Sequence, residues 1–156
     1  MKKDSSGLTP RINNRRALHH YSIEAKLECG IALVGSEVKS LRAGTAQLQE
    51  SFARVERGEL ILHGCYIDPY KQAAMAYNHE PLRERKLLVH KREIRKLEGY
   101  CQERGVTLIP LAIYFKDGRA KLELGVAHSR KAHDKRAAIR KREQDAELRR
   151  AMSRRQ

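Results

Sequence analysis

The sequence YSIEAKLEC, residues 21–29, decides the fold class of this chain. Its less polar side chains fall at every second position and alternate with serine, glutamate and lysine, which is the period of a strand with one buried face. Four similar segments are expected to form two hairpins with short glycine-containing turns: residues 52–56 with 59–62, and 106–115 with 120–126. A fifth segment, residues 66–70, is predicted to be a strand end that is interrupted by a proline. The chain is therefore expected to be mainly β.

Two helices are predicted beside these strands. Ser36 as N-cap, Gly44 just past the end, and Val38 and Leu41 on one face predict a short helix within residues 35–44. A longer amphipathic helix is predicted from four apolar residues and one histidine that recur at steps of three and four: Leu87, His90, Ile94, Leu97 and Cys101. Residues 71–84 lack a period and predict a long surface loop. The pattern as a whole suggests a small antiparallel β-barrel with flanking helices.

Composition limits the partners of such a domain. The chain has 156 residues, a formal net charge of +14 and a pI near 10.0, which favours polyanions, with nucleic acid first and an anionic membrane surface second. No apolar run approaches the roughly 20 residues that span a bilayer, and the first residues lack the apolar centre of a signal peptide. We expect a cytoplasmic protein without a membrane partner.

The sequence offers no catalytic or metal-binding motif. Three cysteines, which we interpret as buried apolar residues, occur without a CxxC pair or a nearby histidine at ligand spacing: Cys29, Cys65 and Cys101. His133 and Asp134 with Ser129 do not form a triad, because neighbours in a tail cannot hold reacting geometry. We expect no enzyme activity, no metal and no cofactor.

The C-terminal residues differ in composition from the rest of the chain. Residues 128–156 contain 11 Lys and Arg against 4 acidic residues, and Ile139, Leu148 and Met152 are their only large apolar side chains. Such a segment cannot close a core, but it is rich in alanine and has no glycine or proline. We predict a disordered leader over residues 1–10, a folded body over 11–127, and a basic tail over 128–156 that is disordered alone and helical on a partner.

Two polar clusters are candidate RNA contacts. Around Arg15 and Arg16, guanidinium groups that can pair with phosphates precede rings that can stack on bases; a solvated basic strand start is an equally good interpretation. Residues 83–88 place three cations at the start of the predicted long helix, which is unfavourable unless an anion lies near; charge balance from Glu80 and Glu84 is the alternative. Glu28 alone would be taken for an ordinary exposed acid.

The order of several blocks resembles the SsrA-binding protein (small protein B) family, the tmRNA partners of bacterial trans-translation. The resemblance covers about residues 11–156, and its matching blocks are NRRA (14–17), ECGI (28–31), GSEVKSLRAG (35–44), YIDPY (66–70), RERKLL (83–88) and HDKR (133–136). It implies an oligonucleotide-binding type of barrel that binds the tRNA-like domain of tmRNA. It also implies a monomer, one per tmRNA, that brings alanyl-tmRNA to stalled ribosomes, with its tail helical in the decoding centre and the empty mRNA channel.

The resemblance also assigns residues. Those implied in tmRNA binding are Asn14, Arg15, Arg16, His19, Tyr21, Glu28, Arg85, Lys86, Leu87 and Leu88. Those implied in ribosome contacts of the tail are Arg130, Lys131, His133, Asp134, Lys135, Arg136, Ile139, Arg140 and Met152. The family usually has Gly-Lys-Lys where this chain has Ser129-Arg130-Lys131, so the exit angle of the tail is expected to differ. The alternatives are a ribosomal or ribosome-assembly protein and an RNA-modifying enzyme; the latter would need a cofactor pocket or a carboxylate pair.

Overall fold

The computed structural model describes residues 9–103, 105–130 and 132–154, with side chains left out for 132–138. Most of the predicted leader therefore lies outside the described residues. The strands are β1 (Ile12–Asn13), β2 (Tyr21–Ile31), β3 (Ala46–Gln47), β4 (Phe52–Glu56), β5 (Glu59–His63), β6 (Tyr66–Ile67), β7 (Arg85–Leu88), β8 (Val106–Lys116) and β9 (Arg119–Ser129). The helices are α1 (Ala17–His20), α2 (Gly35–Arg42), the 3₁₀ turn η1 (Met75–Tyr77), α3 (Lys91–Cys101) and α4 (Ala132–Ser153).

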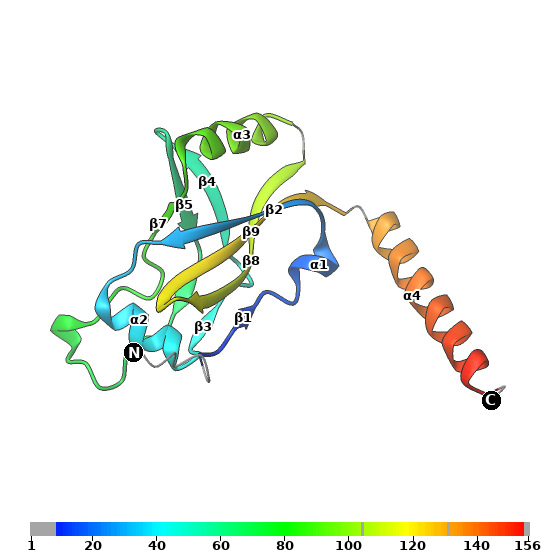
Figure 1. Cartoon of the computed structure of the whole chain (residues 1–156), viewed down its shortest axis with the longest axis horizontal. Helices are drawn as coiled ribbons and strands as arrows, with labels where there is room; N and C mark the ends of the chain where they lie inside the picture. Colours follow the sequence, from blue (N-terminus) through cyan, green and yellow to red (C-terminus); the bar gives the residue numbers. More distant parts are fainter. Residues whose placement is uncertain (1–8, 104, 131, 155–156) are drawn as a thin grey trace.

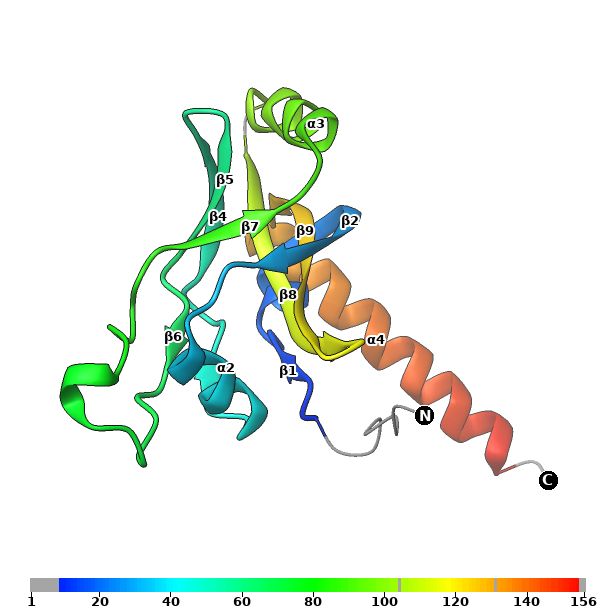
Figure 2. The same ribbon diagram turned by 60° about the vertical axis from the view of Figure 1, so that its left-hand side comes forward.

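The large sheet closes on itself. Its strand order is β1-β8-β4-β5-β7-β2-β9, all pairs are antiparallel, and β9 also pairs with β8, so the strands from β8 round to β9 form a ring. Helix α3 lies across one end of this ring and α2 near the other (Figures 1 and 2). The predicted antiparallel barrel with flanking helices is confirmed.

Both predicted hairpins are confirmed, and their turns explain the register. Arg57 and Gly58 between β4 and β5 both have positive φ, 50° and 74°, and Asp117 and Gly118 between β8 and β9 have 53° and 75°. Two successive residues with positive φ make the type I′ turn, whose twist matches that of the flanking strands. The first turn thus pairs Glu56 with Glu59.

The inside of the ring forms the core. The buried side chains include Leu60 and Leu62 from β5, Leu108 from β8, and Leu122 and Leu124 from β9. Of the cysteines predicted to be buried, Cys29 and Cys65 are, whereas Cys101 is exposed. That prediction was wrong for Cys101 because it lies in the last turn of α3, past Leu97, the buried residue of that helix.

The predicted long helix begins later than its period suggested. Residues 85–88 are strand β7, in which Leu87 pairs with Leu60 of β5 and Ile31 of β2. The spacing of Leu87 and His90 fits a helix, but Leu87 also fits the alternation of a strand. Its segment is a strand because it pairs with β5 on one side and β2 on the other. His90 is instead the N-cap of α3, and its amide donates to the Glu93 carboxylate at 3.3 Å.

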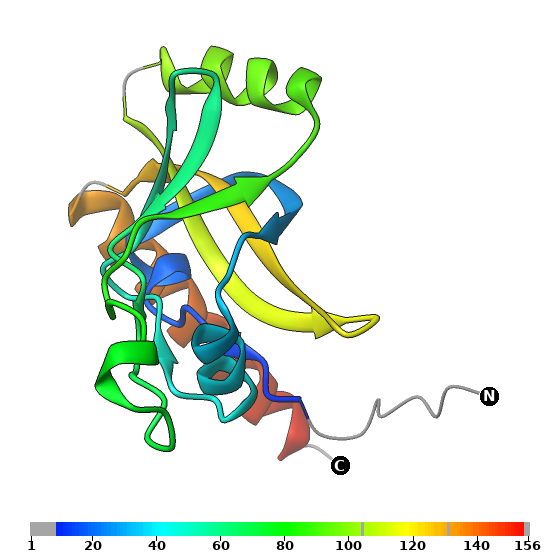
Figure 3. The same cartoon turned by 90° about the vertical axis from the view of Figure 1, so that its left-hand side faces the viewer.

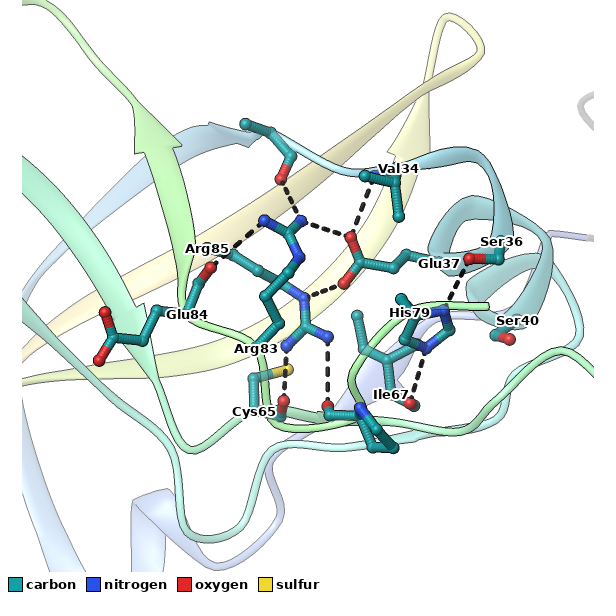
Figure 4. A network of polar contacts seen from close by, with 12 residues as sticks. Val34, Ser36, Glu37, Ser40, Cys65, Ile67, His79, Arg83, Glu84 and Arg85 are labelled. Atoms are coloured by element: carbon teal, nitrogen blue, oxygen red, sulfur yellow. Dashed lines mark hydrogen bonds and ion pairs between the residues drawn. The ribbon is translucent and has the colours of Figure 1, made fainter. Parts of the chain in front are cut away.

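The cations of residues 83–88 therefore do not lie at a helix start, and two of them converge on one buried acid. Glu37 of α2 is fully buried, and its Oε1 accepts from Arg83 Nη2 at 2.5 Å while its Oε2 accepts from Arg85 Nε (Figure 4). Arg85 is 1% exposed. The charge balance comes from Glu37, 48 residues away from Arg85, rather than from Glu80 or Glu84.

The rest of the Arg85 guanidinium is also paired. Its Nη1 donates to the Cys65 carbonyl at 2.6 Å and its Nη2 to the Pro81 carbonyl at 3.2 Å (Figure 4). The network thus joins helix α2, the segment before β6, the long loop and β7. A buried ion pair is tolerated only when its remaining donors are satisfied in this way.

The same network caps helix α2. The Val34 amide donates to Glu37 Oε1 at 3.0 Å, so the N-cap is Val34 and not the predicted Ser36. Ser36 Oγ instead lies 2.9 Å from His79 Nδ1, and His79 Nε2 lies 2.9 Å from the Ile67 carbonyl (Figure 4). Since a carbonyl only accepts, Nε2 carries a proton, and in the neutral ring Nδ1 accepts from the Ser36 hydroxyl.

We predict that Arg85→Met lowers the free energy of unfolding by about 3 to 5 kcal/mol, because it removes one of the two guanidinium groups that compensate the buried Glu37 carboxylate and also removes the donor to the Cys65 carbonyl. Lys86→Met is the matched control: Lys86 pairs with Glu59 on the surface at 3.2 Å, and its loss should cost less than about 1 kcal/mol. Urea unfolding followed by circular dichroism measures both. Equal losses would contradict the structural role of Arg85.

The acid stability of the chain should depend on Glu37. Burial alone would raise the pKa of this carboxyl, but the hydrogen bonds from Arg83, the Val34 amide and Arg85 outweigh it and hold the pKa below the ordinary value of 4.5. A lowered folded-state pKa stabilises the fold above the unfolded-state value, and this contribution is lost as the pH falls through the folded-state pKa. In urea titrations from pH 7 to pH 3, the stability difference between wild type and Glu37→Gln should therefore shrink with falling pH; a constant difference would contradict this.

Candidate nucleic-acid interface

A basic turn stands before β2. Arg15 and Arg16 are exposed there, and no ion pair is found for either within the described part of the chain. His19 and His20 of α1 follow, with ring centroids 5.4 Å apart in an edge arrangement. Unpaired guanidinium groups beside flat rings can contact phosphates and bases together.

Asn14 holds this turn on the barrel. Its side chain is buried, and Nδ2 donates to the Leu48 carbonyl at 3.2 Å and to the Pro110 carbonyl at 2.9 Å. The Asn14 amide donates to the Leu111 carbonyl at 2.8 Å, beside the irregularity between Pro110 and Ala112 in β8. Asn14 is thus placed to fix the position of Arg15 and Arg16 rather than to contact RNA itself.

A second group of polar side chains lies on the outer face of β2, β8 and β9. Glu28 of β2 accepts a hydrogen bond from Tyr114 Oη of β8 at 2.5 Å, and Lys116 Nζ lies 3.6 Å from its other oxygen. The pKa of Glu28 is lowered below its ordinary value, and the hydrogen bond from Tyr114 is the largest of several causes. Glu28 is therefore an ionised acceptor held on an exposed surface.

A neighbouring acid is paired separately. Glu123 of β9 lies directly opposite Glu28, with Arg11 Nη2 3.2 Å and Lys26 Nζ 3.6 Å from its carboxylate. The Arg11 guanidinium also lies 4.9 Å from the centroid of the Tyr114 ring. Cations and acids thus alternate over this face, which can accept from ribose or base donors and pair with phosphates.

The four predicted residues of β7 divide between the two sides of the barrel wall. Arg85 and Leu87 are buried, so they can act on RNA only through the position of their neighbours. Lys86 and Leu88 face outward, and Leu88 is 51% exposed. Leu88 pairs with Gly30 of β2, two residues from Glu28, where a Cβ on Gly30 would lie 3.1 Å from Leu88 Cβ.

Strand β2 links the two regions. Tyr21, half-buried, begins the strand beside the basic turn, and Glu28 lies seven residues on, about 23 Å away for an extended strand. Three residues of this face, Arg11, Tyr114 and Lys116, were not predicted from the sequence. The pairing of β2 with β9 and of β9 with β8 brings Tyr114 and Lys116 to Glu28, and the pairing of β1 with β8 brings Arg11 to Glu123 and the Tyr114 ring, so no local signal could identify them.

The tail starts beside the basic turn. Ser129 pairs with Tyr21, and the Arg130 amide donates to the His20 carbonyl at 3.0 Å. Helix α4 then projects away from the barrel (Figures 1 and 2), and in the view turned by 90° it runs behind the barrel (Figure 3). Lys131 and the side chains of His133, Asp134, Lys135 and Arg136 lie outside the described residues.

The described part of α4 shows no packing face. Ile139 and Met152 are 41% and 64% exposed, and Arg140 is exposed as well. No helix in the described part of the chain is long and apolar enough to cross a membrane. Residues 132–153 are helical in this structure, which agrees with their predicted helix propensity; the dependence of that helix on a partner stays a prediction.

A closed β-barrel with a basic turn, an outer face of alternating charges and a projecting basic helix defines a small nucleic-acid-binding protein of the β-barrel class. Residues 11–154 match the family model described as SmpB protein. The chain belongs to the SmpB family.

Sequence and structural similarity to known proteins support membership of this family. The chain is 52% identical over 143 residues to the SsrA-binding protein of Geobacillus kaustophilus (strain HTA426), covering 92% of each chain. It is 48% identical to that of Thermosynechococcus vestitus (strain NIES-2133 / IAM M-273 / BP-1), covering 91% of this chain and 93% of the other. A solved chain from the work "tmRNA-SmpB: a journey to the center of the bacterial ribosome" matches with a TM-score of 0.69 and 50% identity, over 84% of this chain and 95% of that one.

We predict that Arg15→Ala combined with Arg16→Ala weakens RNA binding and lowers the slope of log affinity against log salt by about 1 to 2, because each phosphate contact releases about one counterion. Arg92→Ala combined with Arg95→Ala is the control, since it removes the same charge from the exposed face of α3. Fluorescence anisotropy with a labelled RNA at several salt concentrations measures both. An equal change of slope in the two variants would show that net charge, not the basic turn, binds RNA.

Proposed function

We propose that this chain is a non-catalytic RNA-binding factor of trans-translation. Its barrel binds the tRNA-like domain of tmRNA and delivers alanyl-tmRNA to stalled ribosomes in the cytoplasm, one monomer per tmRNA. Its tail occupies the empty decoding site and the mRNA channel. The result is release of the ribosome and tagging of the incomplete protein for degradation.

One observation carries the first half of the proposal. The barrel combines arginines for which the described residues provide no ion pair, at one end of β2, with an ionised, oriented carboxylate at the other, so it presents both phosphate-pairing and donor-recognising groups on one wall. A surface that only neutralised charge would need no acid. Family membership and the RNA partner named for the solved relative support the choice of tmRNA.

The tail supports the second half. It is a helix with basic side chains and exposed apolar residues, and it leaves the barrel beside the basic turn. A helix without a face packed on its own body fits a narrow binding site on a partner better than an independent domain. The tail residues that the family resemblance assigns to ribosome contacts, from Arg130 to Met152, are proposed to bind the decoding site and the mRNA channel.

A ribosomal or ribosome-assembly protein is the second candidate. Its basic tail would neutralise rRNA without selecting one RNA, and it would remain on ribosomes whether or not they are stalled. No observation on the barrel favours it over the first proposal.

The proposal predicts selective binding by the body alone. A chain ending after Arg130 should bind the tRNA-like domain of tmRNA as tightly as the full chain, yet fail to support tagging on stalled ribosomes. The cut is placed there because Ser129 and His128 still pair with β2. A gel shift with the tRNA-like domain, against an unrelated duplex of equal length, gives the affinities.

Three outcomes decide. Equal affinity of the full chain for both RNAs would refute a tmRNA-specific function. Loss of RNA binding by the shortened chain, with its circular dichroism spectrum unchanged in the β region, would refute the division between body and tail. Retained tagging would show that the tail does not act on the ribosome.

A further inference from the structure

The pairing of Glu28 is unusual for a strand surface. Glu28 and Glu123 lie directly opposite on β2 and β9, and like charges in that position destabilise a sheet. Each carboxylate has its own partners: Tyr114 and Lys116 for Glu28, Arg11 and Lys26 for Glu123. An arrangement that places two acids together and then neutralises them separately needs a reason other than stability.

Tyr114 differs from the other partners. A lysine ammonium pairs with a carboxylate over many orientations, whereas a phenol on a rigid strand donates from one direction. The position of Tyr114 is itself fixed by two contacts. The Arg11 guanidinium lies 4.9 Å from the centroid of its ring, and its backbone pairs with Lys121 on β9. The pKa of Tyr114 is raised to about 12 by burial and by its hydrogen bond to Glu28, so the hydroxyl stays protonated and remains the donor.

We infer that Tyr114 is a positioning residue for RNA recognition, which holds the Glu28 carboxylate in the orientation that accepts hydrogen bonds from ribose hydroxyl or base amino groups. The inference rests on the proposed function and adds a residue to its site. Tyr114 takes one acceptor position of Glu28 Oε2, and a carboxylate has about four, so positions remain for RNA donors.

A purely structural role for this hydrogen bond is the alternative. Glu28 and Lys116 are exposed, and exposed polar pairs add little to stability. Removing the Tyr114 hydroxyl should therefore leave the fold intact while freeing the carboxylate to rotate. Stability and RNA affinity would then respond differently to the same change.

The test uses the full chain with four variants: Tyr114→Phe, Glu28→Gln, both together, and Tyr100→Phe. Tyr100 packs partly buried from α3 against the core, so its variant removes a phenol hydroxyl away from Glu28. The probe is a transcript of the tRNA-like domain of tmRNA, with the unrelated duplex as reference, and affinity is measured from about pH 3 to 8, so that the range includes the titration of a carboxyl whose pKa lies below 4.5. Thermal melts check that each variant is folded.

At pH 7.5 we expect Tyr114→Phe to bind the tRNA-like domain about fivefold more weakly than wild type, as for loss of a hydrogen bond to a charged group discounted for exposure. Tyr100→Phe should bind like wild type. In the Glu28→Gln background, Tyr114→Phe should have no further effect, because the carboxylate that it orients is gone.

The pH profile is the second readout. The groups facing Glu28 are Tyr114 and Lys116 from β8, Lys121 and Glu123 from β9, and Lys26 on β2 itself. Tyr114 lowers the pKa of Glu28, so wild-type affinity should persist to lower pH, and Tyr114→Phe should lose affinity at a higher pH. Glu28→Gln should lack this acid-dependent loss.

The outcomes separate the inference from the proposed function. If wild type prefers the tRNA-like domain but Tyr114→Phe matches wild type in affinity and pH profile, the positioning role is overturned and the function stands. Additive effects of Tyr114→Phe and Glu28→Gln overturn it as well. If wild type shows no preference between the RNAs, the proposed function fails and the inference falls with it.

Discussion

The fold depends on one buried carboxylate. Glu37 lies on α2, outside the ring of strands, and yet it is fully buried because Arg85 enters the barrel wall from β7 to meet it. An uncompensated charge at that depth would cost several kcal/mol, so α2, the long loop and β7 must come together as a unit. The conformation of the neighbouring outward residues Lys86 and Leu88 follows from that constraint, since strand alternation turns them to the opposite side.

Closure of the ring has a similar consequence for the outer face. Because β9 pairs with both β2 and β8, residues far apart in the sequence form one continuous surface on which Glu28 meets Tyr114, 86 residues away. At the other end of β2, the buried amide of Asn14 fixes the basic turn, and the tail leaves from the same place through Arg130. The barrel therefore sets the distance between the groups proposed to bind RNA and the starting point of the tail.

Local patterns were enough for much of this architecture. The alternation of residues 21–29 became β2, and both hairpins formed with the expected turns at Gly58 and Gly118. Longer-range effects were not predictable: Leu87 fits a helix and a strand equally, and only pairing with β5 and β2 decides between them. The burial of Arg85 and the role of Tyr114 depend on partners brought close by the sheet. In the candidate site, the family resemblance supplied Glu28, but the geometry alone shows what orients it.

We propose that the body selects an RNA while the tail acts on the ribosome. Hydrogen exchange of the full chain measures both parts at once, in the free state, with the tRNA-like domain of tmRNA, and with tmRNA on stalled ribosomes. We expect the RNA domain alone to protect amides around α1 and along the outer strands, and amides of residues 132–153 to gain protection only on the ribosome. Protection of the tail by the RNA domain alone, or none in the body, would contradict it.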